Sequence, residues 1–224
     1  MTTFERDGKT VSVWPGRGPG APLVYLNTFG EEGAQVRAEM DRLGCPDCSL
    51  AAVSGLDWDR DLSPWPAPAI RREEEPFAGG AGDYLRWMTG TLRPAVRAVL
   101  PGDPCWEGLA GYSMAGMFAV WALCQTDVFR RGASMSGSLW YPGVRDYLLG
   151  HLPQPAPDCF YFSLGSKESK TRNPALCTVE EDTRAVEAFY REKGIPTTFQ
   201  LNPGNHFRDT AARTAAGIAW LLRV

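Results

Sequence analysis

One serine near the middle of the chain stands among small residues, and its surroundings constrain the fold more than any other feature. The stretch Gly111–Gly116 reads Gly-Tyr-Ser-Met-Ala-Gly, a strand-like run (106–110) precedes it, and the apolar run from Met114 to Cys124 follows. A serine on a sharp strand-to-helix turn exposes its hydroxyl above a sheet, and only small flanking residues fit such a turn. The pattern therefore predicts a nucleophile elbow at Ser113. The alternative is a serine that only caps a buried helix.

The chain has only two histidines, which limits the choice of a general base for this serine. His206 follows a strand-like run (196–202) and a Pro-Gly-Asn turn, so we expect it on a loop at the end of a strand. A closing helix is expected over 209–222. His151 follows a short helical stretch and is the weaker candidate for the base.

An acid that orients the histidine is expected on a loop after a strand. The run 159–165 is strand-like and Glu168 follows it, so we predict that Glu168 fills this place. The alternative is a solvated loop carboxylate between two lysines. Weaker rivals lie in the first turn of a helix expected to run to Lys193, where a capping box explains them: Glu180, Glu181 and Asp182, with Thr178 as the cap.

Length and charge narrow the class of protein. A chain of 224 residues with 44% hydrophobic content can bury one sizeable core, and we expect a single domain over 1–224. The net charge of −3 is spread along the chain without a basic block, which argues against nucleic acid or an anionic membrane as a partner. No leader or membrane-spanning run is visible, so we expect a soluble, cytoplasmic protein.

Six cysteines raise the question of redox or metal chemistry, above all the Cys-Pro-Asp-Cys motif of Cys45 and Cys48. A thioredoxin-type site would follow a strand and open a helix, whereas this motif follows a helix-like stretch and leads into a strand. A zinc site would need two further ligands, and no second motif supplies them. We therefore expect incidental thiols, no metal site and no cofactor.

Strand-like and helix-like runs alternate along the chain. In order, we expect a hairpin around 7–8, a buried strand at 22–27, a helix at 35–43, a strand at 50–53, a long loop, a helix at 83–100 kinked or divided by Pro94, the strand and elbow, a strand at 132–135, a short helix from Val144, and two closing strand and helix pairs. This order predicts an α/β fold with a mostly parallel twisted sheet covered by helices on both faces.

Loops at the carboxyl ends of parallel strands carry the site in such sheets. A backbone N–H of Thr28 or Phe29, after the strand at 22–27, is the expected second oxyanion donor beside that of Met114. Aromatic side chains on two further loops are expected to shape the substrate pocket: Trp58, Trp65, Trp140 and Tyr141.

These motifs together resemble one branch of the α/β hydrolases. The elbow, the Ser-Gly-Ser-Leu-Trp loop of 136–140, the segment 163–168 and the Gly-Asn-His-Phe stretch of 204–207 are similar to the esterase D and enterochelin-esterase-related proteins. The resemblance covers nearly the whole chain. It implies an α/β-hydrolase fold with little or no cap, and it matches Ser113 and His206 to nucleophile and base and Glu168 to the region of the acid.

The expected activity is hydrolysis of a small-molecule carboxylic ester through an acyl-enzyme on Ser113. Two alternatives stay open. An acyltransferase or thioesterase would use the same triad, and a binding protein of hydrolase fold would hold an inactive site.

Overall fold

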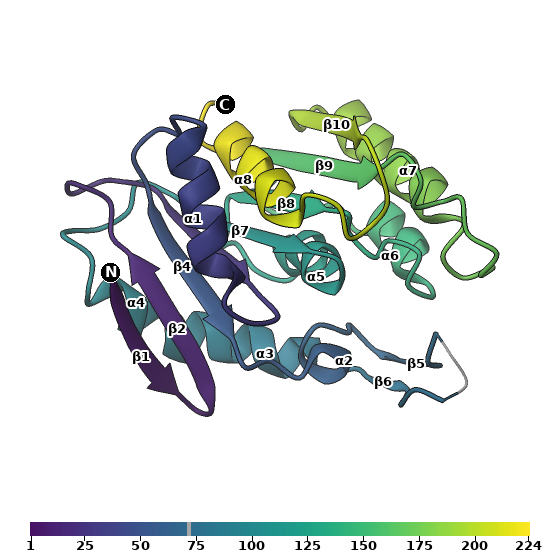
Figure 1. Cartoon of the computed structure of the whole chain (residues 1–224), viewed down its shortest axis with the longest axis horizontal. Coiled ribbons are helices and arrows are strands. Elements are labelled where there is room, and N and C mark those ends of the chain that lie inside the picture. The colour runs from purple at the N-terminus through teal and green to yellow at the C-terminus, as the bar shows by residue number, and fades with distance from the viewer. Residues whose placement is uncertain (71–72) are drawn as a thin grey trace.

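A computed structural model describes residues 1–70 and 73–224, and within these residues an eight-stranded sheet forms the centre of the molecule (Figure 1). Its strands are β1 (Thr2–Arg6), β2 (Lys9–Trp14), β3 (Leu23–Asn27), β4 (Ser49–Ser54), β7 (Glu107–Tyr112), β8 (Arg131–Met135), β9 (Cys159–Gly165) and β10 (Thr197–Asn202). Their order is β1-β2-β4-β3-β7-β8-β9-β10. Only the β1–β2 and β2–β4 pairs in this sheet are antiparallel, so the predicted mostly parallel α/β sheet is confirmed.

Helices cover both faces of this sheet. The helices α1 (Glu32–Arg42) and α8 (Thr210–Leu221) pack against each other on the near face in Figure 1. On the other face lie α3 (Ala81–Trp87), α4 (Arg93–Arg97), α5 (Met114–Leu123), α6 (Val144–Gly150) and α7 (Val179–Glu192). Within the described residues, no helix is both long and apolar enough to cross a membrane.

The alternation of side chains along the central strands produces these two layers. In β3, Val24 and Leu26 pack into the core under α1 and α8, whereas Tyr25 packs into the core on the opposite face. Side chains of a strand point to alternate faces, so a strand buried on both faces must be apolar throughout. The helix α5 is buried at every residue, which explains why its sequence shows no polar face.

The long helix expected over 83–100 is divided into three parts. Between α3 and α4, residues Met88–Leu92 form a π-helical turn. Pro94 lacks an N–H for the carbonyl of Gly90, and a wider turn lets the chain continue without that bond. The helix is therefore interrupted just before the proline.

The long loop before it contains structure that the sequence pattern did not predict. A short helix, α2 (Trp58–Asp61), is capped by Asp57, whose side chain accepts a hydrogen bond from the backbone N–H of Arg60. The strands β5 (Pro66–Ala67) and β6 (Phe77–Ala78) then pair as a small antiparallel ribbon.

Candidate functional site

Ser113 lies on the tight turn that joins β7 to α5. Its φ of +60° falls in the left-handed region that non-glycine residues rarely adopt. A Cβ added to Gly111 would meet the carbonyl oxygen of Ala115 closer than any real contact, and one added to Gly116 would lie 2.9 Å from the carbonyl oxygen of Gly111. The close approach of these backbones is the physical reason for the small residues in the motif.

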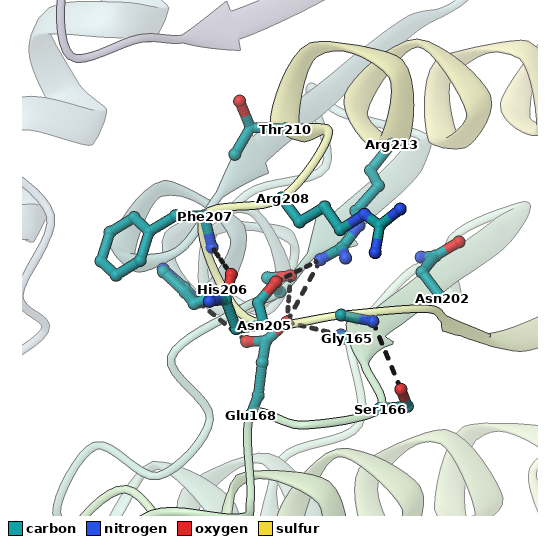
Figure 2. Close-up of polar contacts among 12 residues, drawn as sticks. Gly165, Ser166, Glu168, Asn202, Asn205, His206, Phe207, Arg208, Thr210 and Arg213 are labelled. Atoms are coloured by element: carbon teal, nitrogen blue, oxygen red, sulfur yellow. Dashed lines mark hydrogen bonds and ion pairs between the residues drawn. The ribbon is translucent and has the colours of Figure 1, made fainter.

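His206 and Glu168 meet this serine from two other loops. His206 Nε2 lies 3.1 Å from Ser113 Oγ, and His206 Nδ1 lies 2.8 Å from Glu168 Oε2. Figure 2 shows Glu168 rising from the loop after β9 toward the loop that carries His206 after β10. The three residues singled out in the sequence are thus neighbours in space. His151 lies at the end of α6, where its ring stacks on Tyr147.

Glu168 is held by several donors in addition to the histidine. Its side chain is only 5% exposed, and Oε1 accepts hydrogen bonds from Ser136 Oγ at 2.7 Å and from the backbone N–H of Gly165. Burial by itself raises the pKa of this carboxyl, but hydrogen bonds from His206, Ser136 and Gly165 outweigh it, so the pKa of Glu168 is lowered. The carboxylate is therefore stabilised in its ionised form.

Two further residues support the histidine loop, and the sequence reasoning missed both. Arg213, from the first turn of α8, has a 4% exposed side chain and donates to the carbonyl oxygens of Pro203 and Asn205 at 2.8 and 3.2 Å (Figure 2). Tyr112 donates its O–H to the carbonyl oxygen of His206 at 2.7 Å. A polar residue beside the serine was the only sequence signal for Tyr112, and none pointed to Arg213.

Of the three backbone donors expected around the serine, one has a different partner. The N–H of Thr28 donates to the carbonyl oxygen of Val53 at 2.8 Å, which extends the β3–β4 pairing, so the expectation for Thr28 is wrong. Within the described residues, the N–H groups of Phe29 and Met114 have no hydrogen-bond acceptor. They remain available to a ligand beside Ser113.

Two cavities of about 490 Å³ each adjoin the serine and share Ser113, His206 and Phe207. Trp58 lines the first cavity, under the end of β3, and Trp140 lines the second, beside Glu168. Phe207, which is 83% exposed, stands where the two cavities meet.

The pocket expectation is wrong for the other two aromatic residues. Tyr141 is 1% exposed, and its O–H donates to the carbonyl oxygen of Trp65. It lines neither cavity. Trp65 donates its ring N–H to the carbonyl oxygen of Pro142 at 2.8 Å, packs against Tyr141 and Tyr147, and lines neither cavity. Aromatic loop residues of this kind stabilise the loops instead of contacting a ligand.

The rival acids have other partners, away from His206. Glu180 pairs with Arg184 at 2.9 Å, and Arg145 binds both Glu181 and Asp182. The expected capping box is absent, because the Thr178 side chain makes no cap hydrogen bond. These ion pairs account for the acidic cluster.

The cysteine motif of Cys45 and Cys48 lies between α1 and β4. Burial raises the pKa of both thiols, that of Cys48 to about 12. Within residues 1–70 and 73–224, no three histidine, cysteine or acidic side chains form a group that could hold a metal ion. All six cysteines have free thiols and form no disulfide bond.

The comparisons with known proteins agree with this fold. A protein of Bacillus subtilis (strain 168), Uncharacterized protein YbbA, is 22% identical over 183 residues, which are 79% of this chain and 73% of that protein. The siderophore hydrolase EstA from Aspergillus nidulans has a similar structure, with a TM-score of 0.71, 19% identity, and coverage of 95% of this chain and 89% of that chain.

The enterochelin esterase of Shigella flexneri aligns with a TM-score of 0.73 and 18% identity, over 96% of this chain and 55% of that longer chain. The sheet order, the helices on both faces and the serine turn between β7 and α5 are those of an α/β hydrolase. The chain belongs to the family named Putative esterase, whose model matches residues 35–196. It is thus an enzyme of the hydrolase class, as the sequence resemblance implied.

Proposed function

We propose that this enzyme hydrolyses carboxylic esters through an acyl-enzyme on Ser113, with His206 as general base and Glu168 as the acid that orients it. The observation that carries the proposal is the unbroken line of polar contacts from Ser113 Oγ through the imidazole to Glu168, at 3.1 and 2.8 Å. An activated serine is recognised by a nucleophile and a base within hydrogen-bond distance of each other, with the base oriented by a third group.

In the first half of the reaction, His206 Nε2 takes the proton from Ser113 Oγ as the oxygen attacks the ester carbonyl carbon. Glu168 accepts the hydrogen bond from Nδ1–H, which fixes the tautomer and stabilises the imidazolium that forms. The N–H groups of Met114 and Phe29 would donate to the oxyanion. As the tetrahedral intermediate collapses, the ester C–O bond breaks and His206 returns the proton to the leaving alkoxide.

In the second half, a water molecule attacks the acyl-enzyme. His206 takes a proton from this water, and the second tetrahedral intermediate releases the carboxylic acid while Ser113 Oγ regains its proton. The two cavities that adjoin Ser113 offer separate space to the acyl and alcohol halves of the substrate.

A fluorophosphonate probe tests the proposal directly, because it reacts with activated serines. We expect the wild-type enzyme to be labelled and to hydrolyse p-nitrophenyl acetate, and Ser113→Ala to lose both. Ser12→Ala is the matched control, since Ser12 lies on β2, where its hydroxyl contacts that of Thr3 at 3.1 Å, and it lines neither cavity. An unlabelled wild-type enzyme would favour an inactive binding protein instead.

A further inference from the structure

Two exposed phenylalanine rings stand beside the reactive serine. Phe29, on the loop after β3, is 74% exposed, and Phe207, on the loop after β10, is 83% exposed. Every other phenylalanine, tyrosine and tryptophan among the described residues is buried or half-buried. Both exposed rings line the first cavity, together with Ser113 and His206. Apolar side chains that are exposed together beside a reactive group indicate a surface that a ligand covers.

The backbone fixes both rings at this place. Thr28, which precedes Phe29, donates its N–H and its O–H to the carbonyl oxygen of Val53 at 2.8 and 3.1 Å. On the other loop, the side-chain oxygen of Asn205 accepts a hydrogen bond from the N–H of Phe207 at 3.1 Å. Figure 2 shows the Phe207 ring projecting from this loop. Because the loops are already ordered, a ligand can cover the rings at little cost in conformational entropy.

The rest of the cavity wall is apolar as well. The Trp58 ring lies against Phe29, with 5.6 Å between the ring centroids, and it lines the same cavity. Further apolar wall residues come from β3, α1 and α8, namely Leu26, Val36 and Ala211. The cavity volume of about 490 Å³ is enough for a six-membered ring. Aromatic faces of this kind pack well against another flat ring.

The charges around the cavity argue against an anionic group. Glu32 is the one carboxylate among the described residues that line it, and this carboxylate accepts from the N–H of Gly30 at 2.6 Å. No lysine or arginine lines the cavity within the described residues. An anionic group would lose hydration and meet a like charge without a compensating cation, whereas an uncharged ring would gain from leaving water.

We propose that the first cavity binds an uncharged, ring-bearing apolar group of the ester substrate against Phe29 and Phe207. This inference rests on the proposed ester hydrolysis at Ser113 and names the class of substrate for it. The two rings would act in specificity, because the apolar surface that they lose to water on binding favours substrates with a matching apolar group.

Matched esters test for such a group on each side of the ester bond. Benzyl acetate and ethyl acetate differ on the alcohol side, and ethyl phenylacetate and ethyl acetate differ on the acyl side. We expect the wild-type enzyme to favour the ring-bearing ester of one pair by about tenfold to a hundredfold in kcat/KM. Each value is divided by the rate of alkaline hydrolysis of the same ester, which removes differences in intrinsic reactivity. Equal efficiency within both pairs would overturn the inference.

Removing the rings locates this preference in the first cavity. Phe29→Ala and Phe207→Ala keep the backbone N–H groups, and each should reduce the ring preference severalfold. The preference is a ratio within one variant, so a general loss of activity cancels. Leu201→Ala is the matched control and should retain the preference, since Leu201 is a 44% exposed apolar residue on β10 that lines neither cavity. An unchanged preference in both phenylalanine variants would overturn the inference.

A second comparison tests the charge of the bound group. On the side of the ester that carries the preference, the ring receives either a para-carboxylate or a para-carboxamide, and the wild-type enzyme should favour the carboxamide by about fivefold or more. Glu32→Gln removes the charge and keeps an oxygen for the N–H of Gly30, so it should narrow this difference. Glu31→Gln is the matched control, because Glu31 is exposed and lines neither cavity. A wild-type enzyme that favoured the carboxylate would overturn the inference.

Binding to Ser113→Ala separates this inference from the proposed function. This variant cannot form an acyl-enzyme, so saturation-transfer NMR can titrate its affinity for benzyl acetate and ethyl phenylacetate. Adding Phe207→Ala should weaken the binding of the preferred ester by about fivefold or more, and adding Leu201→Ala should not.

The two proposals fail in different ways. Ser113-dependent hydrolysis without a ring preference would leave the ester mechanism standing and reject the cavity assignment. Ring binding that depends on Phe207, without Ser113-dependent hydrolysis of any ester, would reject the mechanism and support the cavity assignment. Equal affinity in the presence and absence of the Phe207 ring would reject the cavity assignment.

Discussion

At the residue scale, each oxygen of the Glu168 carboxylate has its own partners. Oε2 lies against His206 Nδ1, and Oε1 accepts from Ser136 and Gly165. These donors hold the carboxylate in one orientation, so that the oxygen facing the imidazole is fixed before a substrate arrives. Such preorganisation is what an orienting acid contributes to catalysis.

Replacing this carboxylate with its amide isolates that contribution. We expect Glu168→Gln to lower kcat by as much as about 10⁴ with little change in KM, because the amide can stabilise the wrong imidazole tautomer. Steady-state hydrolysis of p-nitrophenyl acetate, with circular dichroism to check folding, measures the effect. Glu181→Gln is the matched control, since its 73% exposed side chain pairs with Arg145 on the surface. If both variants kept full activity, Glu168 would have no orienting role.

At the scale of elements, the helix α8 controls the histidine loop through one side chain. Arg213 joins the carbonyl oxygens of Pro203 and Asn205, and its guanidinium lies 3.5 Å from Glu168 Oε1. In Arg213→Gln, the two carbonyl oxygens and the Glu168 carboxylate would lose the buried guanidinium as a hydrogen-bond donor. We expect a loss of about 3–5 kcal/mol in the free energy of unfolding, which is typical of breaking a buried ion pair.

Catalysis should respond as well, because the loop sets the position of His206. For Arg213→Gln, kcat should fall at least about tenfold while KM changes little. The control is Arg208→Gln on the same loop, whose 62% exposed side chain pairs with Asp209 at 3.3 Å and should contribute less than about 1 kcal/mol. Equal urea midpoints and equal kcat values for the two variants would contradict this role of Arg213.

The same elements show what the sequence could and could not reveal. Apolar runs and turn residues located β7, β9 and β10 to within one or two residues, because periodicity and glycine reflect local backbone geometry. Which donor binds which acceptor depends on contacts between distant segments. The sequence left Thr28 and Phe29 as alternative donors to a ligand, and only the structure shows that the N–H of Thr28 extends the sheet. Nothing in the sequence indicated that Arg213 reaches the histidine loop.

At the scale of the whole molecule, the parallel sheet gathers the site from four loops. Strands β3, β7, β9 and β10 end on the same side, so Phe29, Ser113, Glu168 and His206 meet although they are far apart in the sequence. The stability of the folded molecule is coupled to the site, because the hydrogen bonds that orient the carboxylate also lower its pKa.

That coupling predicts how stability depends on pH. The pKa of Glu168 lies below its usual value of 4.5 in the folded protein, so the unfolded chain binds this proton at higher pH than the folded one. Its contribution is therefore fully present above about pH 4.5 and is lost as the pH falls through the folded pKa. We expect the difference in unfolding free energy between wild type and Glu168→Gln to change in favour of the variant as the pH falls below about 4.5. Urea unfolding at a series of pH values measures it, and a difference that moved in favour of the wild type on acidification would show that the folded state raises this pKa.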